Sequence, residues 1–334
     1  MSFLLRVLTL ISLIESPSMA ASSWVLGEGY VALNSLNQGV QLIHGLRPKS
    51  WALDSKLCRL WVEDEITRQL WKIDTDGSAE PVTTGARIIS DLRDGRWLTL
   101  LGTQTIQERD ASGLVLNSWK VDWANGVKRI HLLGNAQSLV LNHIESSNRK
   151  SELSVLRFDK EWNKIQTYLV ESQAELWGGF DFQVDESRQN LWLGYAKTTP
   201  SHVYSPQVGH FDLNGTAKTI KSFNERGLFF GSCLSPEGTY LMARDIPSAQ
   251  FTVPVYSFLE KFIAGGQSST ALNLETNLLV DALACDSEAV SIASHSILNA
   301  SKTELITWDW NLSHSPQRIA DLPAKANHIY HCGN

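Results

Sequence analysis

Four cysteines are the residues of this chain with the most obvious chemical potential: Cys58, Cys233, Cys285 and Cys332. An even set of this kind can close two disulfide bonds, in any of three connectivities. Buried free thiols are the alternative, because unpaired cysteine is among the most buried residue types. The sequence contains no C-x-x-C pair and no cysteine–histidine spacing typical of a zinc site. The cysteines therefore indicate structural roles.

The nine histidines are scattered, and only His328 and His331 lie within a few residues of each other. On an extended strand an i, i+3 pair points to opposite faces, which disfavours a shared metal. The sequence also has no G-x-S-x-G, H-E-x-x-H, phosphate-binding loop or C-x-x-C-H haem motif. The histidines are therefore predicted to be structural, and no catalytic residue can be named from these motifs.

The stretch from Leu57 to Thr83 indicates the kind of secondary structure that holds the cysteines and histidines in place. Short β-rich runs at 60–62 and 69–73 flank a polar turn, and an Asp-Thr-Asp-Gly turn leads to a third run. Alternating apolar and polar residues joined by such turns predict a small antiparallel meander. One meander cannot bury both of its faces, so its recurrence along the chain decides the architecture.

The second strand of this unit recurs as a turn followed by a β-rich run. It appears seven times, at Gly29–Leu33, Arg59–Val62, Gly95–Leu100, Gln137–Leu141, Asn190–Leu193, Gly238–Met242 and Ala289–Ile292. A D-x-x-G turn marks the step from a third to a fourth strand at 74–77, 110–113 and 212–215, with weaker echoes at Asp159 and Asp309. The pattern predicts an all-β fold, a β-propeller of seven four-stranded blades in a single domain over residues 24–334. If the first repeat is a cap, the ring has six blades.

Closure of the ring is predicted from the two ends of the chain. The first repeat leaves little room for an innermost strand, whereas residues 326–332 resemble the predicted innermost strands at 229–233 and 281–285. A C-terminal strand that completes the first blade would remove both sheet edges. A frayed tail is the alternative. Ser172–Leu176 is the one segment with the pattern of a helical turn, and Ser22–Ser23 reads as a terminal tail.

The same placement favours two cysteine pairs. Cys233 and Cys285 would end innermost strands of adjacent blades, and Cys332 would lie next to Cys58, which opens a second strand. We therefore expect disulfides between Cys233 and Cys285 and between Cys58 and Cys332. The second bond would hold the closing strand in place.

Twelve tryptophans are an unusual feature of the composition. Trp61, Trp71, Trp97 and Trp192 occupy strand positions, where packing between blades is expected. Others lie in or beside predicted turns or strand ends: Trp24, Trp51, Trp123, Trp162, Trp177, Trp308 and Trp310. Most are expected to be core residues, and several could line a rim or channel mouth that binds a sugar, a peptide or a partner protein.

Composition and the N-terminus narrow the compartment and the partners. The net charge of −6 and the lack of a Lys/Arg cluster argue against nucleic acid as a partner. Arg6, an apolar run from Val7 to Ile14 and small residues at Ser18 and Ala20 predict a signal peptide over residues 1–20. No later stretch is long and apolar enough for a spanning helix. The expected location is the periplasm or the exterior, without a membrane span in the mature chain.

Residues 60–77, LWVEDEITRQLWKIDTDG, resemble the repeat of NHL, YVTN and related bacterial propellers. The resemblance extends over most of the mature chain, and it implies a fold and no specific activity, because such propellers bind, scaffold or catalyse.

A narrower resemblance is to the gluconolactonase-type propeller lactonases. Leu26-Gly27-Glu28-Gly29 is similar to the start of their L-G-E-G-P motif, and residues 235–238 followed by Asp245 are similar to their S-P-D-G block. The resemblance implies Glu28 and Asp245 as ligands of one divalent cation such as calcium. Phe180 and Phe230 stand where that family has its two asparagine ligands, which breaks the site because calcium needs oxygen ligands.

Two functions follow as hypotheses. The first is an exported, non-catalytic binding or assembly module that uses one face of the ring to bind another protein or a small ligand, without a cofactor. The alternative is an enzyme of the lactonase or esterase type, or a redox-partner propeller, with its site in the central channel. Three or four convergent Asp, Glu, Asn or His side chains at the axis would favour catalysis.

Overall fold

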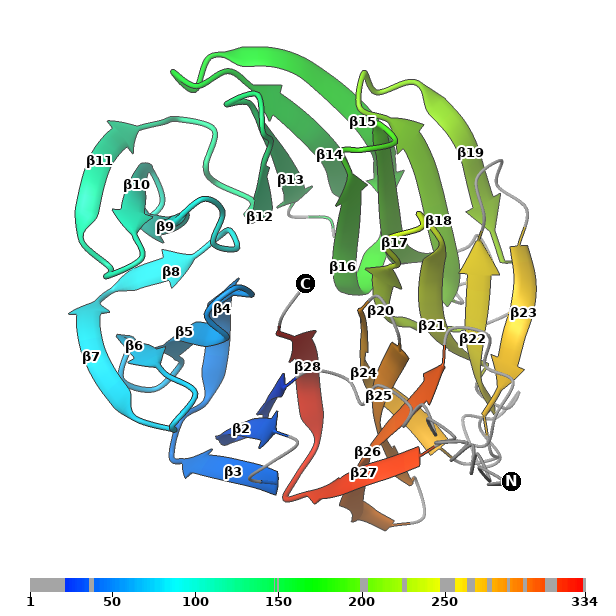
Figure 1. The fold of residues 1–334 in the computed structure, drawn as a ribbon. Coiled ribbons are helices and arrows are strands. Elements are labelled where there is room, and N and C mark those ends of the chain that lie inside the picture. The colour runs from blue at the N-terminus through cyan, green and yellow to red at the C-terminus, as the bar shows by residue number, and fades with distance from the viewer. Residues whose placement is uncertain are drawn as a thin grey trace, which may run out of the picture.

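The computed structural model describes residues 22–35, 39–146, 148, 150–198, 204–223, 227–246, 256–262, 268–274, 278–286, 289–296, 299–309 and 317–332. Within these residues every regular element is a β-strand, and the strands form seven four-stranded antiparallel sheets arranged in a ring (Figure 1). The predicted all-β, seven-bladed propeller is confirmed. The predicted signal peptide, residues 1–20, lies outside the described residues. The described segments include no helix long and apolar enough to span a membrane.

We letter the blades A to G in chain order and give the strands of each from the innermost outward. Blade A consists of β28 (Ala326–His331), β1 (Ser23–Gly27), β2 (Tyr30–Ser35) and β3 (Gly39–His44). Blade B consists of β4 (Pro48–Asp54), β5 (Arg59–Asp64), β6 (Gln69–Ile73) and β7 (Ala79–Thr84). Blade C consists of β8 (Ala86–Ile88), β9 (Arg96–Leu101), β10 (Thr105–Asp110) and β11 (Val115–Lys120). Blade D consists of β12 (Val127–Leu132), β13 (Ser138–Glu145), β14 (Ser151–Phe158) and β15 (Lys164–Ala174).

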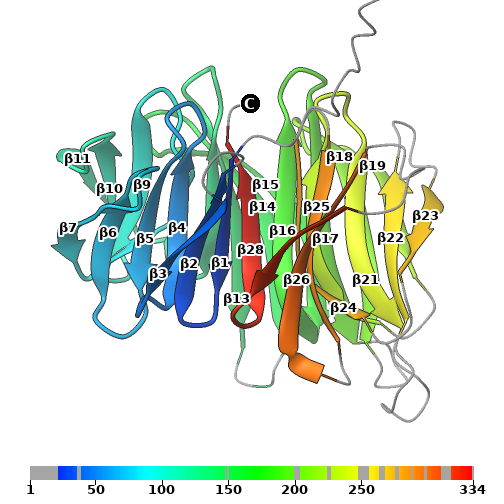
Figure 2. The ribbon, with the colours of Figure 1, turned by 60° about the horizontal axis from the view of Figure 1, so that its bottom comes forward.

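The second half of the ring repeats this order. Blade E consists of β16 (Leu176–Asp185), β17 (Asn190–Thr198), β18 (Tyr204–Asp212) and β19 (Ala217–Ser222). Blade F consists of β20 (Phe229–Leu234), β21 (Tyr240–Ile246), β22 (Tyr256–Phe262) and β23 (Ser268–Asn273). Blade G consists of β24 (Leu278–Cys285), β25 (Ala289–Ser296), β26 (Asn299–Asp309) and β27 (Gln317–Leu322). The strands run between two faces of the ring, where the connecting turns gather (Figure 2).

Six of the seven recurring β-rich runs are second strands, as predicted, and the first is not. The run at Gly29–Leu33 belongs to β2, the third strand of blade A. The second strand is β1, which includes Ser23 of the predicted tail, and all five of its residues are buried. A strand buried on both faces lacks the alternation of apolar and polar residues, so the periodicity of the sequence did not reveal it. Ser172–Leu176, predicted as a helical turn, is the junction of β15 and β16.

The turns between third and fourth strands share one geometry. In blades B, C and E the amide of the turn glycine donates to the carbonyl of the turn aspartate, and the glycine has a positive φ of 81° at Gly77, 92° at Gly113 and 83° at Gly215. Glycine is favoured there because it has no Cβ. Blade D makes the same turn from Asp159, but the left-handed position is Trp162, with φ 65°.

The C-terminal strand closes the ring as expected. β28 pairs with β1 in the register Val25↔Ile329 and lies beside β24 of blade G. A disulfide joins Cys332, just after β28, to Cys58 in the turn before β5, and a second joins Cys233 of β20 to Cys285 of β24. Each bond links two adjacent blades. Both termini of the ring-forming segment are therefore held inside blade A.

The hydrophobic core is a series of layers between neighbouring blades. Trp61 of blade B and Trp97 of blade C are fully buried with ring centroids 5.5 Å apart, and Trp192 of blade E stacks on Tyr240 of blade F at 5.1 Å. Trp24, predicted near a strand end, is instead buried within β1, where its indole N–H donates to the Cys58 carbonyl at 3.0 Å. Large flat rings fill the space between the blades and so hold the innermost strands around the axis.

Candidate functional site

A cavity of about 590 Å³ occupies the centre of the ring, and all seven innermost strands contribute to its lining. Its size is typical of small-molecule sites, which range from about 300 to 1,000 Å³. The innermost strands run in the same direction around the axis, so equivalent positions on them lie at the same depth in the channel. The chemistry of the cavity therefore follows from which residue each blade places at each depth.

Three neighbouring blades place a cation at the same end of the channel. Lys49, Arg87 and Lys128 are the second residues of β4, β8 and β12, and all three line the cavity. We call this group the basic mouth. The second residues of β20 and β28, Phe230 and Asn327, carry no charge. Positive charge is thus concentrated on one side of the channel.

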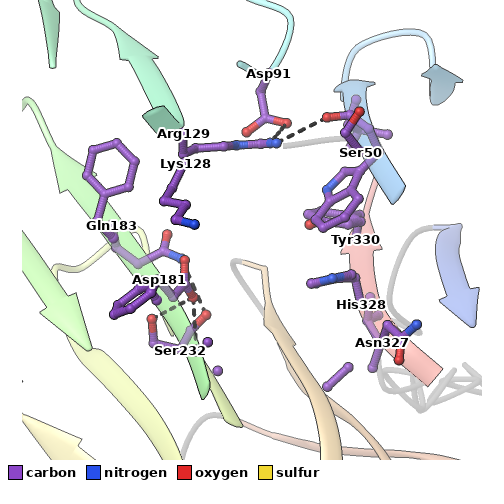
Figure 3. Close-up of a pocket in the computed structure, with 18 of the residues that line it drawn as sticks. Ser50, Asp91, Lys128, Arg129, Asp181, Gln183, Ser232, Asn327, His328 and Tyr330 are labelled. Atoms are coloured by element: carbon purple, nitrogen blue, oxygen red, sulfur yellow. Dashed lines mark hydrogen bonds and ion pairs between the residues drawn. The ribbon is translucent and has the colours of Figure 1, made fainter. Parts of the chain in front are cut away.

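The cations of the basic mouth form no ion pair within the described part of the chain. The Arg87 guanidinium donates to the Val127 carbonyl at 2.7 Å. Lys128 extends into the cavity (Figure 3). Burial and the nearby Arg87 lower the pKa of Lys128, and burial also lowers the pKa of Arg87. Like charges held together destabilise one another, and an anion placed between them would relieve this repulsion.

Arg129 lies deeper in the channel and crosses from β12 toward β4. One guanidinium nitrogen donates to the Trp51 carbonyl at 3.1 Å and another to the Asp91 carboxylate, and the guanidinium carbon lies 5.7 Å from the centre of the Trp51 ring (Figure 3). Burial acts to lower the pKa of Arg129, but Asp91 acts in the opposite direction and the net shift is upward. These contacts fix the guanidinium across one wall of the cavity.

The facing wall carries a carboxylate that is held by neutral donors. Asp181 of β16 accepts from the backbone amide of Ser232 at 3.1 Å, from its hydroxyl at 2.8 Å, and from Gln183 at 3.2 Å (Figure 3). Burial raises the pKa of Asp181 despite these hydrogen bonds. Phe180 and Phe230, from the same two strands, also line the cavity. This wall is therefore more apolar than the wall that carries the basic mouth.

Aromatic rings of blades A and B complete the lining. His328 lies 3.8 Å from the Trp51 ring and 6.3 Å from the Tyr330 ring. Burial, and then the charge of Arg129, lowers the pKa of His328 to about 3, so its imidazole is neutral at physiological pH. Across the whole lining, four Lys and Arg side chains face two carboxylates, Asp91 and Asp181. The channel carries net positive charge although the whole chain is acidic.

Glu28 and Asp245, the two metal ligands implied by the lactonase resemblance, do not line this cavity. Glu28 is exposed in the turn between β1 and β2 of blade A. Asp245 is buried in β21 of blade F, where it accepts from the Leu228 amide at 2.6 Å, and burial raises its pKa to about 6. Blade G separates the two. The donor set does not fit a calcium ion, since Phe180 and Phe230 offer phenyl rings at the positions of the missing ligands.

The histidine pair behaves as strand geometry predicts. His328 lines the channel, whereas His331 is buried beside Asp286, with 3.3 Å between its Nδ1 and the carboxylate. Within the described residues no group of three or more His, Cys, Asp or Glu side chains could hold a metal ion. Five side chains of the types that could favour catalysis line the channel, Asp91, His131, Asp181, Asn327 and His328, but Asp91 is paired with Arg129 and Asp181 is held by Ser232 and Gln183.

Sequence reasoning missed the basic mouth. The usable signal was a Lys or Arg at the start of a short innermost strand, in P-K-S-W, A-R-I and V-K-R-I. The cations are about 40 residues apart along the chain, so they form no cluster that composition could reveal. Only the ring brings three equivalent strand positions together.

No protein-family model matches the chain, and no curated protein matches it. Many solved structures match the fold. A functionally unknown protein from Desulfotomaculum acetoxidans is 14% identical, with a TM-score of 0.58 over 94% of this chain and 99% of that one. The dihydro-heme d1 dehydrogenase NirN is 10% identical, with a TM-score of 0.56 over 94% and 76% of the two chains.

The β-propeller domain of the Trilobed protease from Pyrococcus furiosus, which has an open velcro topology, is 11% identical, with a TM-score of 0.56 over 90% and 94% of the two chains. At these identities the likenesses concern the fold alone, because propellers of similar shape carry unrelated functions. The chain is thus a seven-bladed β-propeller. Its relation to NHL or YVTN repeats stays a prediction.

Proposed function

We propose that this protein is an exported, non-catalytic binding module that takes a small anionic ligand in the central channel, at the basic mouth. The observation that carries the proposal is the placement of Lys49, Arg87 and Lys128 at the same position of three adjacent blades, where none of them forms a salt bridge with a described residue. Unpaired cations that line a concave site raise the local concentration of anions and bind them with charge-assisted hydrogen bonds.

The facing wall refines the ligand class. Phe180, Phe230 and Leu283 offer apolar surface, and Asp181 is engaged by Ser232 and Gln183. An anionic head group would meet the basic mouth while an apolar portion packs against the phenyl rings. A small carboxylate or phosphate ester with a hydrocarbon part fits this arrangement.

Export is supported by the predicted signal peptide and by the two disulfides between adjacent blades. Disulfides persist in oxidising compartments such as the periplasm and the exterior. A lactonase centre is not proposed, because its two carboxylates lie in blades A and F and its other two ligand positions hold phenylalanine.

The proposal is tested by calorimetric titration of the purified mature protein with a panel of C4 to C12 mono- and dicarboxylates and organic phosphate esters. We expect at least one anion to bind, with an affinity that falls as salt is added, because charged contacts at the channel mouth are partly screened. Lys128→Glu should abolish that binding. Lys164→Glu, a charge reversal at an exposed position on the outer strand of blade D, is the matched control and should leave it unchanged.

If no panel anion binds the wild-type protein, or if Lys128→Glu binds as well as wild type, the proposal is wrong. If crosslinking recovers a protein partner whose binding is not inhibited by any of the anions, the result would instead support assembly through a face of the ring. Detectable turnover of a lactone or ester panel would overturn the non-catalytic assignment.

A further inference from the structure

A second concave site lies between blades C and D, at the ring face opposite the basic mouth. It has a volume of about 520 Å³ and is lined by the β8–β9 and β12–β13 turns, by one face of blade C, and by the β14–β15 turn. The β8–β9 and β12–β13 turns lie at the far ends of innermost strands whose second residues, Arg87 and Lys128, belong to the basic mouth. The groove and the channel are therefore separate sites.

Two partly exposed tryptophans form the apolar part of this groove. Trp119 of β11 and Trp162 of the β14–β15 turn have ring centroids 6.0 Å apart in an edge-to-face arrangement. Behind them Trp123 stacks on Phe158 at 4.0 Å, which anchors the pair to the buried layer between the blades. Neither the Trp119 nor the Trp162 indole N–H donates a hydrogen bond to any described residue. Rigid rings with unused donors are well suited to contact a ligand.

Trp162 occupies a backbone position that three other blades give to glycine. Its amide donates to the Asp159 carbonyl as the amides of Gly77, Gly113 and Gly215 donate to their aspartates, and its φ of 65° is left-handed. A bulky side chain is unfavourable at such a φ. The chain thus accepts local strain to place an indole at this turn, and strained residues cluster at binding sites.

The lining of the groove carries equal numbers of cations and carboxylates, namely Arg93, Arg96 and Lys160 against Asp94, Glu108 and Asp159. Its three cations each have a carboxylate partner, in the ion pairs Arg93–Glu186, Arg96–Glu108 and Lys160–Glu161. Glu108 also accepts from the Asn117 amide at 2.5 Å, so guanidinium, carboxylate and amide form a row across β9, β10 and β11. Paired charges present oriented hydrogen-bond donors and acceptors without a net field. The basic mouth differs in this respect, because its cations form no salt bridge with any described residue and give it a net positive charge.

We propose that the groove between blades C and D binds a neutral oligosaccharide. The C–H faces of a pyranose ring pack against indole rings, while its hydroxyl groups both donate and accept and so match a mixed row of guanidinium, carboxylate and amide groups. The balanced charge favours a neutral glycan over an acidic or basic peptide. The inference goes beyond the anion site of the channel and does not depend on it.

The test uses the mature protein and saturation-transfer NMR with cellotetraose, maltotetraose and N-acetylchitotetraose at millimolar concentration, followed by calorimetry for any glycan that binds. Trp162→Gly is the decisive variant, because it restores the residue of the equivalent turns and keeps the backbone favourable. We expect it to weaken glycan binding by about tenfold or more, corresponding to the loss of one stacking ring. Glu108→Gln should weaken binding while leaving the fold intact.

Ile165→Ala, at an exposed apolar position on the neighbouring strand β15, is the matched control and should bind as the wild type does. Far-UV circular dichroism and the melting temperature establish that each variant is folded. The inference is overturned if none of the three glycans binds the wild-type protein, or if Trp162→Gly binds a glycan with unchanged affinity.

Discussion

The disulfide between Cys58 and Cys332 should stabilise the ring more than the one between Cys233 and Cys285. The first bond closes a loop of 274 residues and the second a loop of 52. In the chain-entropy model, a cross-link restricts the unfolded chain by an amount that grows with the logarithm of loop length, which corresponds to about 5.6 and about 4.1 kcal/mol at 25 °C. The predicted difference between the two bonds in their contribution to the free energy of unfolding is about 1.5 kcal/mol.

The assay compares two double variants, Cys58→Ala with Cys332→Ala and Cys233→Ala with Cys285→Ala, by guanidinium unfolding. Each pair removes the same atoms and links two adjacent blades, so the cavities left behind nearly cancel in the comparison. Tryptophan fluorescence and far-UV circular dichroism must give coincident transitions before free energies are compared. The reduced wild-type protein provides the common reference.

The reasoning is refuted if the two variants are equally stable or if the order is reversed. Equal stability would mean that residual structure in the unfolded state already restricts its conformational freedom, or that contacts in the native state, and not loop length, set the stability lost with each disulfide. A larger loss for Cys58 and Cys332, accompanied by early exchange of the β1 and β28 amides, would show that this bond holds the closing strand.

Three further predictions concern the channel and the packing between blades. Lys128→Gln should stabilise the ligand-free protein by no more than about 0.5 kcal/mol, because burial and Arg87 disfavour the charge of Lys128. The same variant should bind the anion more weakly. Thermal unfolding with and without the anion measures both effects. Gly194→Ala should cost about 1–3 kcal/mol in a denaturant titration, because a Cβ would lie 2.3 Å from the Phe229 ring, whereas Gly179→Ala, with open space around it, should be neutral. Burial, and then Lys218, lowers the pKa of His210 to about 4, so the unfolded state binds more protons between pH 6.5 and 4. The contribution of His210 to stability is then fully present above pH 6.5, and the free energy of unfolding should fall by up to about 3 kcal/mol as the pH drops to 4. His210→Phe should reduce this loss. An unaltered pH profile of stability in that variant would contradict the prediction.

Much of the fold was predictable because propeller blades are local structures. Strands, turns and their order lie within about 40 residues of each other, and alternation of apolar residues with Asp-Gly turns reports them directly. The exception was β1, where all five residues are buried and no alternation exists. Its identity depends on β28, which joins the sheet from the other end of the chain.

The candidate sites were far less predictable, for a geometric reason. Residues that a motif placed together, Glu28 and Asp245, lie in different blades, while residues that share no motif, such as Lys49 and Lys128, meet at the channel. Trp162 gave a visible signal, a tryptophan where related turns have glycine, but its meaning required the turn geometry and the neighbouring Trp119.

The sequence by itself determined an all-β chain of repeating meanders with an even set of cysteines and a final strand free to close the ring. Local hydrophobic periodicity and turn chemistry suffice for that, since each depends on residues near one another in the chain. Tertiary structure alone decided which side chains face the axis and which face the groove between blades C and D. Ring closure sets neighbours that are 40 to 300 residues apart, and the local pattern of a strand carries no information about the residue opposite it across a channel.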